Sequence, residues 1–278
     1  MIPRSKHLIA GTLVSFGVAA LLWQPAPASA AFSLQSLLGG ITQSVSSLFA
    51  ARQSPELSPA QIAAQELAAR KDTVSRVFDL TLAEQRNLSD QLNQLQNLSP
   101  SESAMRDRLS SLLAENQASF TQIRARLDTA ATADEVKQLA EDFKNWRTAV
   151  YDSKLEKIVA FAFVYQENSV LSTAESRASK VAEDIAVRPL GDAKDAANAA
   201  VGHARSDIQR AEDLHQQART LLMIALNTSL STTTLASAAN DATVQRNIAD
   251  AKLLTQQSYG FVADAYQIFI QLSAKLMR

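Results

Sequence analysis

An unbroken run of eight apolar residues, Ile158–Tyr165, constrains the fold of this chain more than any other stretch. A helix that is apolar on every side must be covered on every side by other parts of the protein. The run is too short to span a bilayer, which needs ~20 residues. It therefore predicts the inner helix of a helical bundle, with a core that includes Trp146, Ile158, Phe161, Phe163 and Tyr165.

The composition favours helices throughout. The chain of 278 residues contains only seven glycines and seven prolines, and alanine, leucine, glutamine and serine predominate. Few helix-breaking residues and many strong helix formers predict an all-α protein. We expect an elongated antiparallel helical bundle, or coiled coil, of about five or six long helices.

Composition also excludes several kinds of function. The chain has no cysteine, which excludes disulfides, thiolate metal sites and a cysteine nucleophile. Its formal net charge is −1 and no basic patch stands out, so we expect no nucleic-acid partner. Neither a glycine-rich phosphate loop nor a nucleophile-elbow motif occurs, and we expect no cofactor and no enzymatic activity.

Residues 1–30 have the three parts of a secretory signal peptide. Two basic residues precede an apolar stretch at 8–23, and a small-residue motif predicts cleavage between Ala30 and Ala31. The protein is then exported to the periplasm or the cell exterior. The alternative is an uncleaved inner-membrane anchor formed by residues 8–23.

The mature chain divides into two parts. Residues 31–57 are weakly amphipathic, contain Gly39 and Gly40, and end in a proline-containing linker, so they predict a marginal helix. Residues 58–278 predict the helical bundle domain.

Helix starts are marked by capping boxes, in which a Ser or Thr side chain and a Glu or Gln three residues later satisfy free backbone N–H groups. Such boxes stand at Ser58–Gln61, Ser99–Glu102, Thr132–Glu135 and Ser153–Glu156. With a stop at residues 188–191, they predict helices at 59–98, 100–130, 133–151, 153–187, 192–227 and 239–276.

Apolar residues recur at alternating spacings of three and four along these helices, which is the pattern of a packed seam. Two polar residues, Gln85 and Asn116, fall on seam positions. Each is either a solvated weak point or a device that fixes the register of the helices.

A metal site is the only chemistry for which the sequence offers weak candidates. His203 and Asp207 are four residues apart, and Glu212 and His215 form a Glu-x-x-His motif. A di-iron bundle needs two such motifs and two further carboxylates, whereas one motif is present. We therefore expect His215 to be a packing residue on the seam rather than a ligand.

One part of the sequence resembles a known group of proteins. The shared features are Phe143–Arg147, Val150–Tyr151, Lys157–Val159 and Gln166–Arg177, with Val77–Thr81 upstream. Over residues 70–225 the chain resembles uncharacterised, predicted-secreted helical proteins of candidate-phylum bacteria. Those proteins often have Pro after the Val-Tyr pair, where this chain has Asp152. The group has no activity that could be carried over.

Together these features predict an exported, non-enzymatic helical bundle of the bacterial cell envelope that acts as a structural or protein-interaction module. We expect a protein partner or self-association. Membrane contact is expected only through the N-terminal segment, if that segment is not cleaved.

Three alternatives remain open. The first is a membrane-active, pore-forming-like protein that exposes Ile158–Tyr165 or Leu221–Leu226 by rearrangement. The second, by analogy of fold alone, is a periplasmic component of a secretion or conjugation apparatus. The third is a metal-binding bundle or enzyme that uses the four weak candidates.

Overall fold

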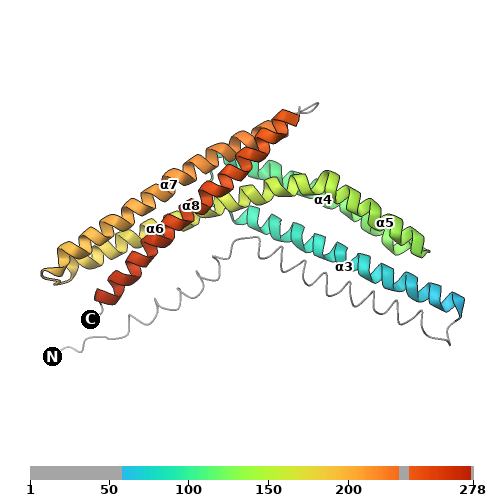
Figure 1. The fold of residues 1–278 in the computed structure, drawn as a ribbon, viewed down its shortest axis with the longest axis horizontal. Coiled ribbons are helices and arrows are strands. Elements are labelled where there is room, and N and C mark those ends of the chain that lie inside the picture. Colours follow the sequence, from blue (N-terminus) through green and yellow to red (C-terminus); the bar gives the residue numbers. More distant parts are fainter. Residues whose placement is uncertain (1–57, 232–237, 277–278) are drawn as a thin grey trace. The chain divides into compact units, whose positions relative to one another are not determined.

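A computed structural model describes residues 58–231 and 238–276, and these residues form helices joined by short turns (Figure 1). The helices are α3 (Pro59–Gln94), α4 (Pro100–Thr129), α5 (Ala133–Trp146), a π-helical turn (Arg147–Tyr151), α6 (Asp152–Val187), α7 (Ala193–Ser231) and α8 (Ala238–Leu276). No strand occurs in this described part, so the protein is all-α as predicted. The predicted signal peptide, the cleavage position between Ala30 and Ala31, and the segment 31–57 lie outside the described residues.

The chain divides into two compact units. One comprises residues 1–81 and 124–140, and the other comprises 82–123 and 141–278. The dividing points fall inside α3, α4 and α5. The region 58–278, predicted as one domain, therefore contains parts of both units.

In the first unit, the described parts of α3, α4 and α5 share a small apolar core. The side chains of Phe78, Leu127, Val136 and Leu139 are buried there. Polar contacts also join these helices. Arg124 Nη1 lies 2.6 Å from Asp79 Oδ1 in an ion pair, Lys71 Nζ donates to the Asp128 carbonyl at 3.1 Å, and Arg70 Nη1 donates to the Ala133 carbonyl at 3.2 Å.

Three of the four predicted capping boxes form. At Ser58–Gln61 the serine hydroxyl accepts from the glutamine N–H at 3.3 Å, and the glutamine Oε1 accepts from the serine N–H at 2.9 Å. The same reciprocal pair forms at Ser99–Glu102, with distances of 3.4 and 2.7 Å, and at Thr132–Glu135, with 3.2 and 3.3 Å. These side chains satisfy backbone N–H groups that have no partner within the helix.

The fourth box, at Ser153–Glu156, was predicted wrongly. The backbone stays helical through Trp146 (φ −61°) and Asp152 (φ −60°), with no side-chain cap. The N–H of Asp152 bonds to the carbonyl of Arg147, five residues back, which is the bond of a π-helical turn. Because the helix never breaks, no free N–H group is left for a cap to satisfy.

Two other helix ends differ from the prediction. α3 ends at Gln94, earlier than expected, and Asn97 takes a left-handed conformation (φ 57°) in the turn before α4. α7 continues to Ser231, beyond the predicted end at 227. Its Ser and Thr side chains bond back to the helix, as Thr228 Oγ1 does to the Ile224 carbonyl at 2.8 Å, so they do not end it. The stop after α6 is confirmed, with Gly191 at φ 53°.

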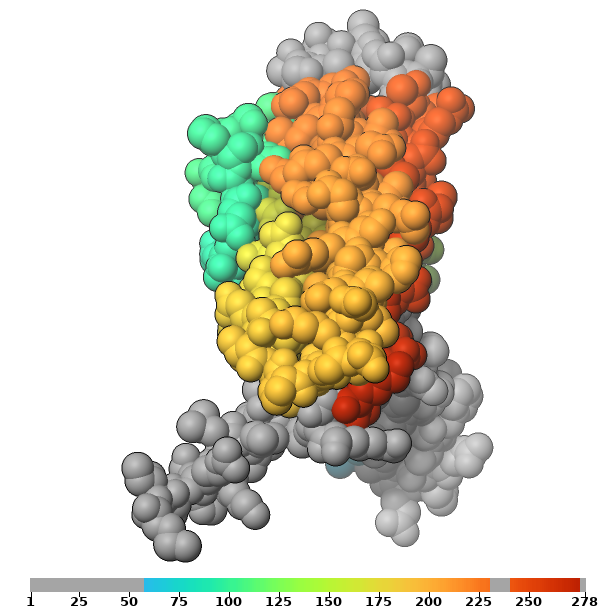
Figure 2. Space-filling view, turned by 90° about the vertical axis from the view of Figure 1, so that its left-hand side faces the viewer, coloured from blue at the N-terminus to red at the C-terminus, as the bar shows by residue number. Residues whose placement is uncertain are grey.

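The second unit contains the main core, which has two apolar clusters. In the first, Leu92 and Leu109 of the α3–α4 hairpin meet Phe161 of α6, Leu222 of α7 and Ile248 of α8. The second cluster contains residues from the C-terminal half of α6, the N-terminal half of α7 and the C-terminal part of α8, among them Ile185, Val201 and Phe269. Residue numbers rise along one helix as they fall along its neighbour, so α6 and α7 run antiparallel, as do α7 and α8. Figure 2 shows α7 facing the viewer with α8 along one side.

The predicted inner helix is α6. Ile158, Phe161 and Tyr165 are buried, whereas Trp146 and Phe163 are only partly covered. Among the described helices, none is long and apolar enough to cross a membrane.

Candidate functional site

Polar side chains are buried where α6 and α7 meet the turn between α3 and α4 in the second unit. We take this buried polar network as the candidate functional site. Its members are Glu102 from α4, Tyr165, Glu167 and Asn168 from α6, and His215 and Arg219 from α7.

His215 is 1% exposed and contacts α6 through both ring nitrogens. Its Nδ1 lies 2.9 Å from Glu167 Oε2, and its Nε2 lies 2.6 Å from Asn168 Oδ1. The Asn168 amide nitrogen donates to the carbonyls of Gln96 and Asn97 at 3.1 and 3.3 Å. A chain of hydrogen bonds thus runs from α7 through α6 to the α3–α4 turn.

The hydrogen bonds of Asn168 assign a hydrogen to one ring nitrogen of His215. Because the Asn168 nitrogen donates to two carbonyls, its Oδ1 must accept, and His215 Nε2 must carry a hydrogen. The second Glu167 oxygen, Oε1, is buried without a hydrogen-bond partner among the described residues.

Glu102 is the centre of the other half of the network. Arg219 donates to it from Nε at 2.9 Å and from Nη2 at 2.7 Å, and the Tyr165 hydroxyl donates at 2.8 Å. The backbone N–H of Ser99 donates to its other oxygen at 2.7 Å. Burial alone would raise the pKa of Glu102, but the bonds from Arg219, Ser99 and Tyr165 lower it below its usual value. Burial and the bond to Glu102 raise the pKa of Tyr165.

A second polar cluster lies at the π-helical turn. Arg147 Nη2 and the Tyr151 hydroxyl donate to Glu84 Oε2 at 3.2 and 3.3 Å. Trp146 stacks on Tyr151 with ring centroids 5.2 Å apart. Burial raises the pKa of Glu84 more strongly than Arg147 lowers it.

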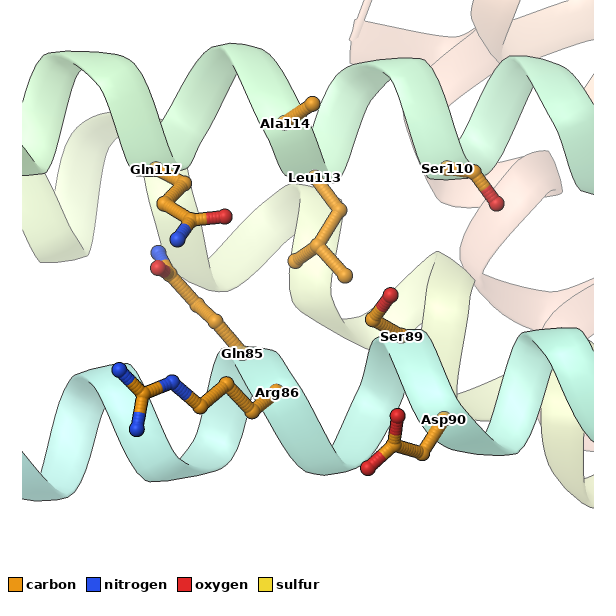
Figure 3. Close-up of a pocket in the computed structure, with 8 residues that line it drawn as sticks. All are labelled: Gln85, Arg86, Ser89, Asp90, Ser110, Leu113, Ala114 and Gln117. Carbon is orange, nitrogen blue, oxygen red and sulfur yellow. The ribbon is translucent and has the colours of Figure 1, made fainter.

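A cavity of about 280 Å³ opens between α3 and α4 (Figure 3). Gln85 lines it and is 2% exposed. Neither amide atom of Gln85 has a hydrogen-bond partner in the described part of the chain. The other polar seam residue, Asn116, is also buried, and its Oδ1 accepts from Lys154 Nζ at 3.3 Å.

The four weak metal candidates lie on α7 and do not converge. His203 is exposed, Asp207 pairs with Arg210 at 3.4 Å, Glu212 is half-buried, and only His215 is part of the network. Within the described ranges, no three His, Asp or Glu side chains are placed to hold a metal ion.

Sequence reasoning placed His215 on a seam but missed its partners. Glu167 is named only within the resembling segment, Asn168 is not singled out at all, and Glu102 is named only as a capping residue. A signal was available, because Asn168 continues the spacing of Ile158, Phe161 and Tyr165 along one face of α6. A polar residue on such a face predicts a buried polar partner, although it does not identify that partner.

Comparisons with known protein families, with curated proteins and with solved structures found no match to the chain. The resemblance to secreted helical proteins therefore stays a prediction.

Proposed function

We propose that this protein is an exported, non-enzymatic helical bundle of the bacterial cell envelope, and that it acts as a structural or protein-interaction module. Its function depends on residues at its surface and on the fixed arrangement of its helices. It associates with a protein partner or with further copies of itself.

One observation carries the proposal: the buried polar side chains connect helices to one another. The Glu102 carboxylate is held by Arg219 and Tyr165, and His215 uses both ring nitrogens on α6. Groups engaged in this way define which helices pair and in which register. Side chains that bind substrates instead project into open pockets.

The spacing of the seams supports a coiled-coil arrangement of the second unit. On α7 the buried residues alternate by four and three positions over the whole helix: Ala197, Val201, Ala204, Ile208, Ala211, His215, Ala218, Leu222 and Ala225. α8 repeats this spacing from Val244 to Leu272. Sustained heptads are typical of long helices that pair side by side.

The export part is tested by cell fractionation with N-terminal sequencing of the native protein. A start at Ala31 in a soluble envelope fraction is the expected result. An intact Met1 in the membrane fraction would favour the anchor at residues 8–23, and an intact Met1 in the cytosol would overturn export.

The association part is tested by photo-crosslinking in cells. Probes replace Ile224 on α7 and Leu253 on α8, which are among the large apolar side chains exposed on the described helices, at 50% and 51%. A probe at exposed Lys180 on α6 is the control. We expect discrete crosslinked species from the apolar positions, and their absence at all three would count against association.

A further inference from the structure

We propose that α7 and α8 form a docking face for a second copy of this chain, along a line of half-buried apolar side chains that we call the α7–α8 stripe. The stripe consists of Leu214 and Leu221 on α7 and of Leu254, Phe261 and Ile268 on α8. The inference rests on the association part of the proposed function, and it names the partner and the surface. It concerns the second unit alone.

On α8, the stripe lies on the side that faces away from α6. The side toward α6 is marked by Tyr259, whose ring centroid lies 6.1 Å from that of Phe163 on α6. Each residue of a helix turns by about 100°, so Phe261, two positions after Tyr259, points to the opposite side. Leu254 and Ile268 stand two turns before and after Phe261 and therefore share its side.

On α7, the stripe continues along the side that adjoins Phe261. The Arg210 guanidinium of α7 lies over the Phe261 ring, 5.8 Å from its centroid. Leu214 and Leu221 follow on the same side of α7 as Arg210, because neighbours on a helix face are three or four residues apart. Arg219, two positions before Leu221, points to the other side and bonds to α4. The apolar side chains of α7 and α8 therefore form one line.

Part of each stripe residue stays exposed. Leu221 and Leu254 pack at their inner side against the first apolar cluster, and Phe261 and Ile268 pack against the second. The stripe therefore extends along both clusters, and its α8 part alone runs for ~21 Å at 1.5 Å per residue. A contiguous line of apolar surface is typical of an interaction site. In four-helix packing, a further pair of helices covers such a line.

The charges beside the stripe favour a second copy as its occupant. Arg210 stands on the α7 edge, and its side chain is 62% exposed although it pairs with Asp207 at 3.4 Å. The α8 edge carries the exposed acids Asp250 and Asp264, each four residues before a stripe residue. If two copies meet through this face with α7 of each over α8 of the other, the basic edge of one lies against the acidic edge of the other. The face is thus complementary to itself.

The test is sedimentation equilibrium of the protein expressed from its whole coding sequence, for which we expect a dimer. Asp250→Lys with Asp264→Lys makes both edges basic and should raise the Kd of the dimer about tenfold or more, because like charges then meet across the interface. Adding Arg210→Glu exchanges the charges of the two edges and should recover much of the affinity. The matched control, Glu175→Lys with Glu183→Lys at exposed positions of α6, changes the net charge equally and should dimerise as the wild type does.

Each outcome separates this inference from the proposed function. A monomer at every concentration overturns the inference, and the proposed function then requires a different protein as partner. A dimer that the α8 variant leaves intact, or that the control weakens equally, assigns self-association to another surface and overturns the stripe alone. Photo-crosslinking in cells from exposed Gln257 on α8 identifies the occupant. A crosslinked homodimer is expected, and a product with another protein in its place overturns the choice of a second copy.

Discussion

Arg219 on α7 holds the carboxylate of Glu102 on α4 with two nitrogens, although 117 residues separate them in the chain. Nε lies 2.9 Å and Nη2 2.7 Å from Glu102 Oε1, and Nη2 also reaches Oε2 at 2.7 Å. The same carboxylate caps α4 through the Ser99 N–H. The Glu102 side chain therefore caps the N-terminus of α4 and also links this N-terminus to α7.

Glu102→Ala should lower the free energy of unfolding by about 3 kcal/mol. Only 8% of the Glu102 side chain is exposed, and 18% of Arg219, so the substitution leaves a largely buried cation without its partner. Urea denaturation measures the loss. The control, Glu175→Ala on the exposed face of α6, should stay within about 0.5 kcal/mol of the wild type; equal effects would contradict the role of the pair.

The pKa of Glu102 predicts a loss of stability in acid. Its pKa is lowered from 4.5 in the folded chain. The stability that it contributes is fully present above pH 4.5 and is lost as the pH falls through the lower folded value. Glu102→Gln should therefore flatten the acid side of the stability curve, measured as Tm against pH. An unchanged acid side would show that other carboxylates determine it.

The raised pKa of Glu84 predicts the opposite dependence of stability on pH. Burial raises its pKa above 4.5, so folding favours the protonated carboxyl. Its ionisation costs stability progressively as the pH rises from 4.5 through the folded pKa. Glu84→Gln should remove this part of the pH dependence and narrow the difference in Tm between pH 5 and pH 7. If the variant keeps the difference of the wild type, Glu84 does not titrate as described.

Tyrosine ionisation can be followed directly by ultraviolet absorbance. The chain has four tyrosines, and burial raises the pKa of Tyr151, Tyr165, Tyr259 and Tyr266 above 10.0. The folded protein should therefore show little tyrosinate at pH 10, and unfolding in denaturant should bring the midpoint back to about 10. A midpoint near 10 before unfolding would contradict this burial.

The two histidines of α7 allow a substitution at a buried position to be compared with one at an exposed position. His215→Ala should cost about 3 kcal/mol of stability, because it leaves buried Glu167 and Asn168 without their shared partner. His203→Ala, at an exposed position, should change stability by less than about 0.5 kcal/mol. Metal analysis of both variants and the wild type should find no stoichiometric metal. Metal lost on either substitution would support the metal alternative.

Much of the fold follows from local signals in the sequence. The buried seam of α7, from Ala197 to Ala225, follows from the sequence alone, because its spacing of three and four is set by the geometry of the helix itself. The capping box at Ser99–Glu102 was predictable for the same reason, since its partners lie three residues apart.

The features that could not be predicted from the sequence depend on contacts between residues that are far apart in the chain. The π-turn before Asp152 replaces a predicted break, and nothing local distinguishes the two. For α8 the apolar pattern places Phe261 and Ile268 on the seam, but the buried residues there are Val262 and Phe269, and Phe261 and Ile268 are only partly buried. The pairing of His215 with Glu167 spans 48 residues, and no spacing within a helix encodes it.

Native mass spectrometry of the protein taken from its own cell fraction tests the central claim most directly. An association module should appear with a mass above that of one chain, as a homo-oligomer or as a complex with another protein. Recovery of a single unbound chain, both before and after crosslinking in cells, would contradict the account.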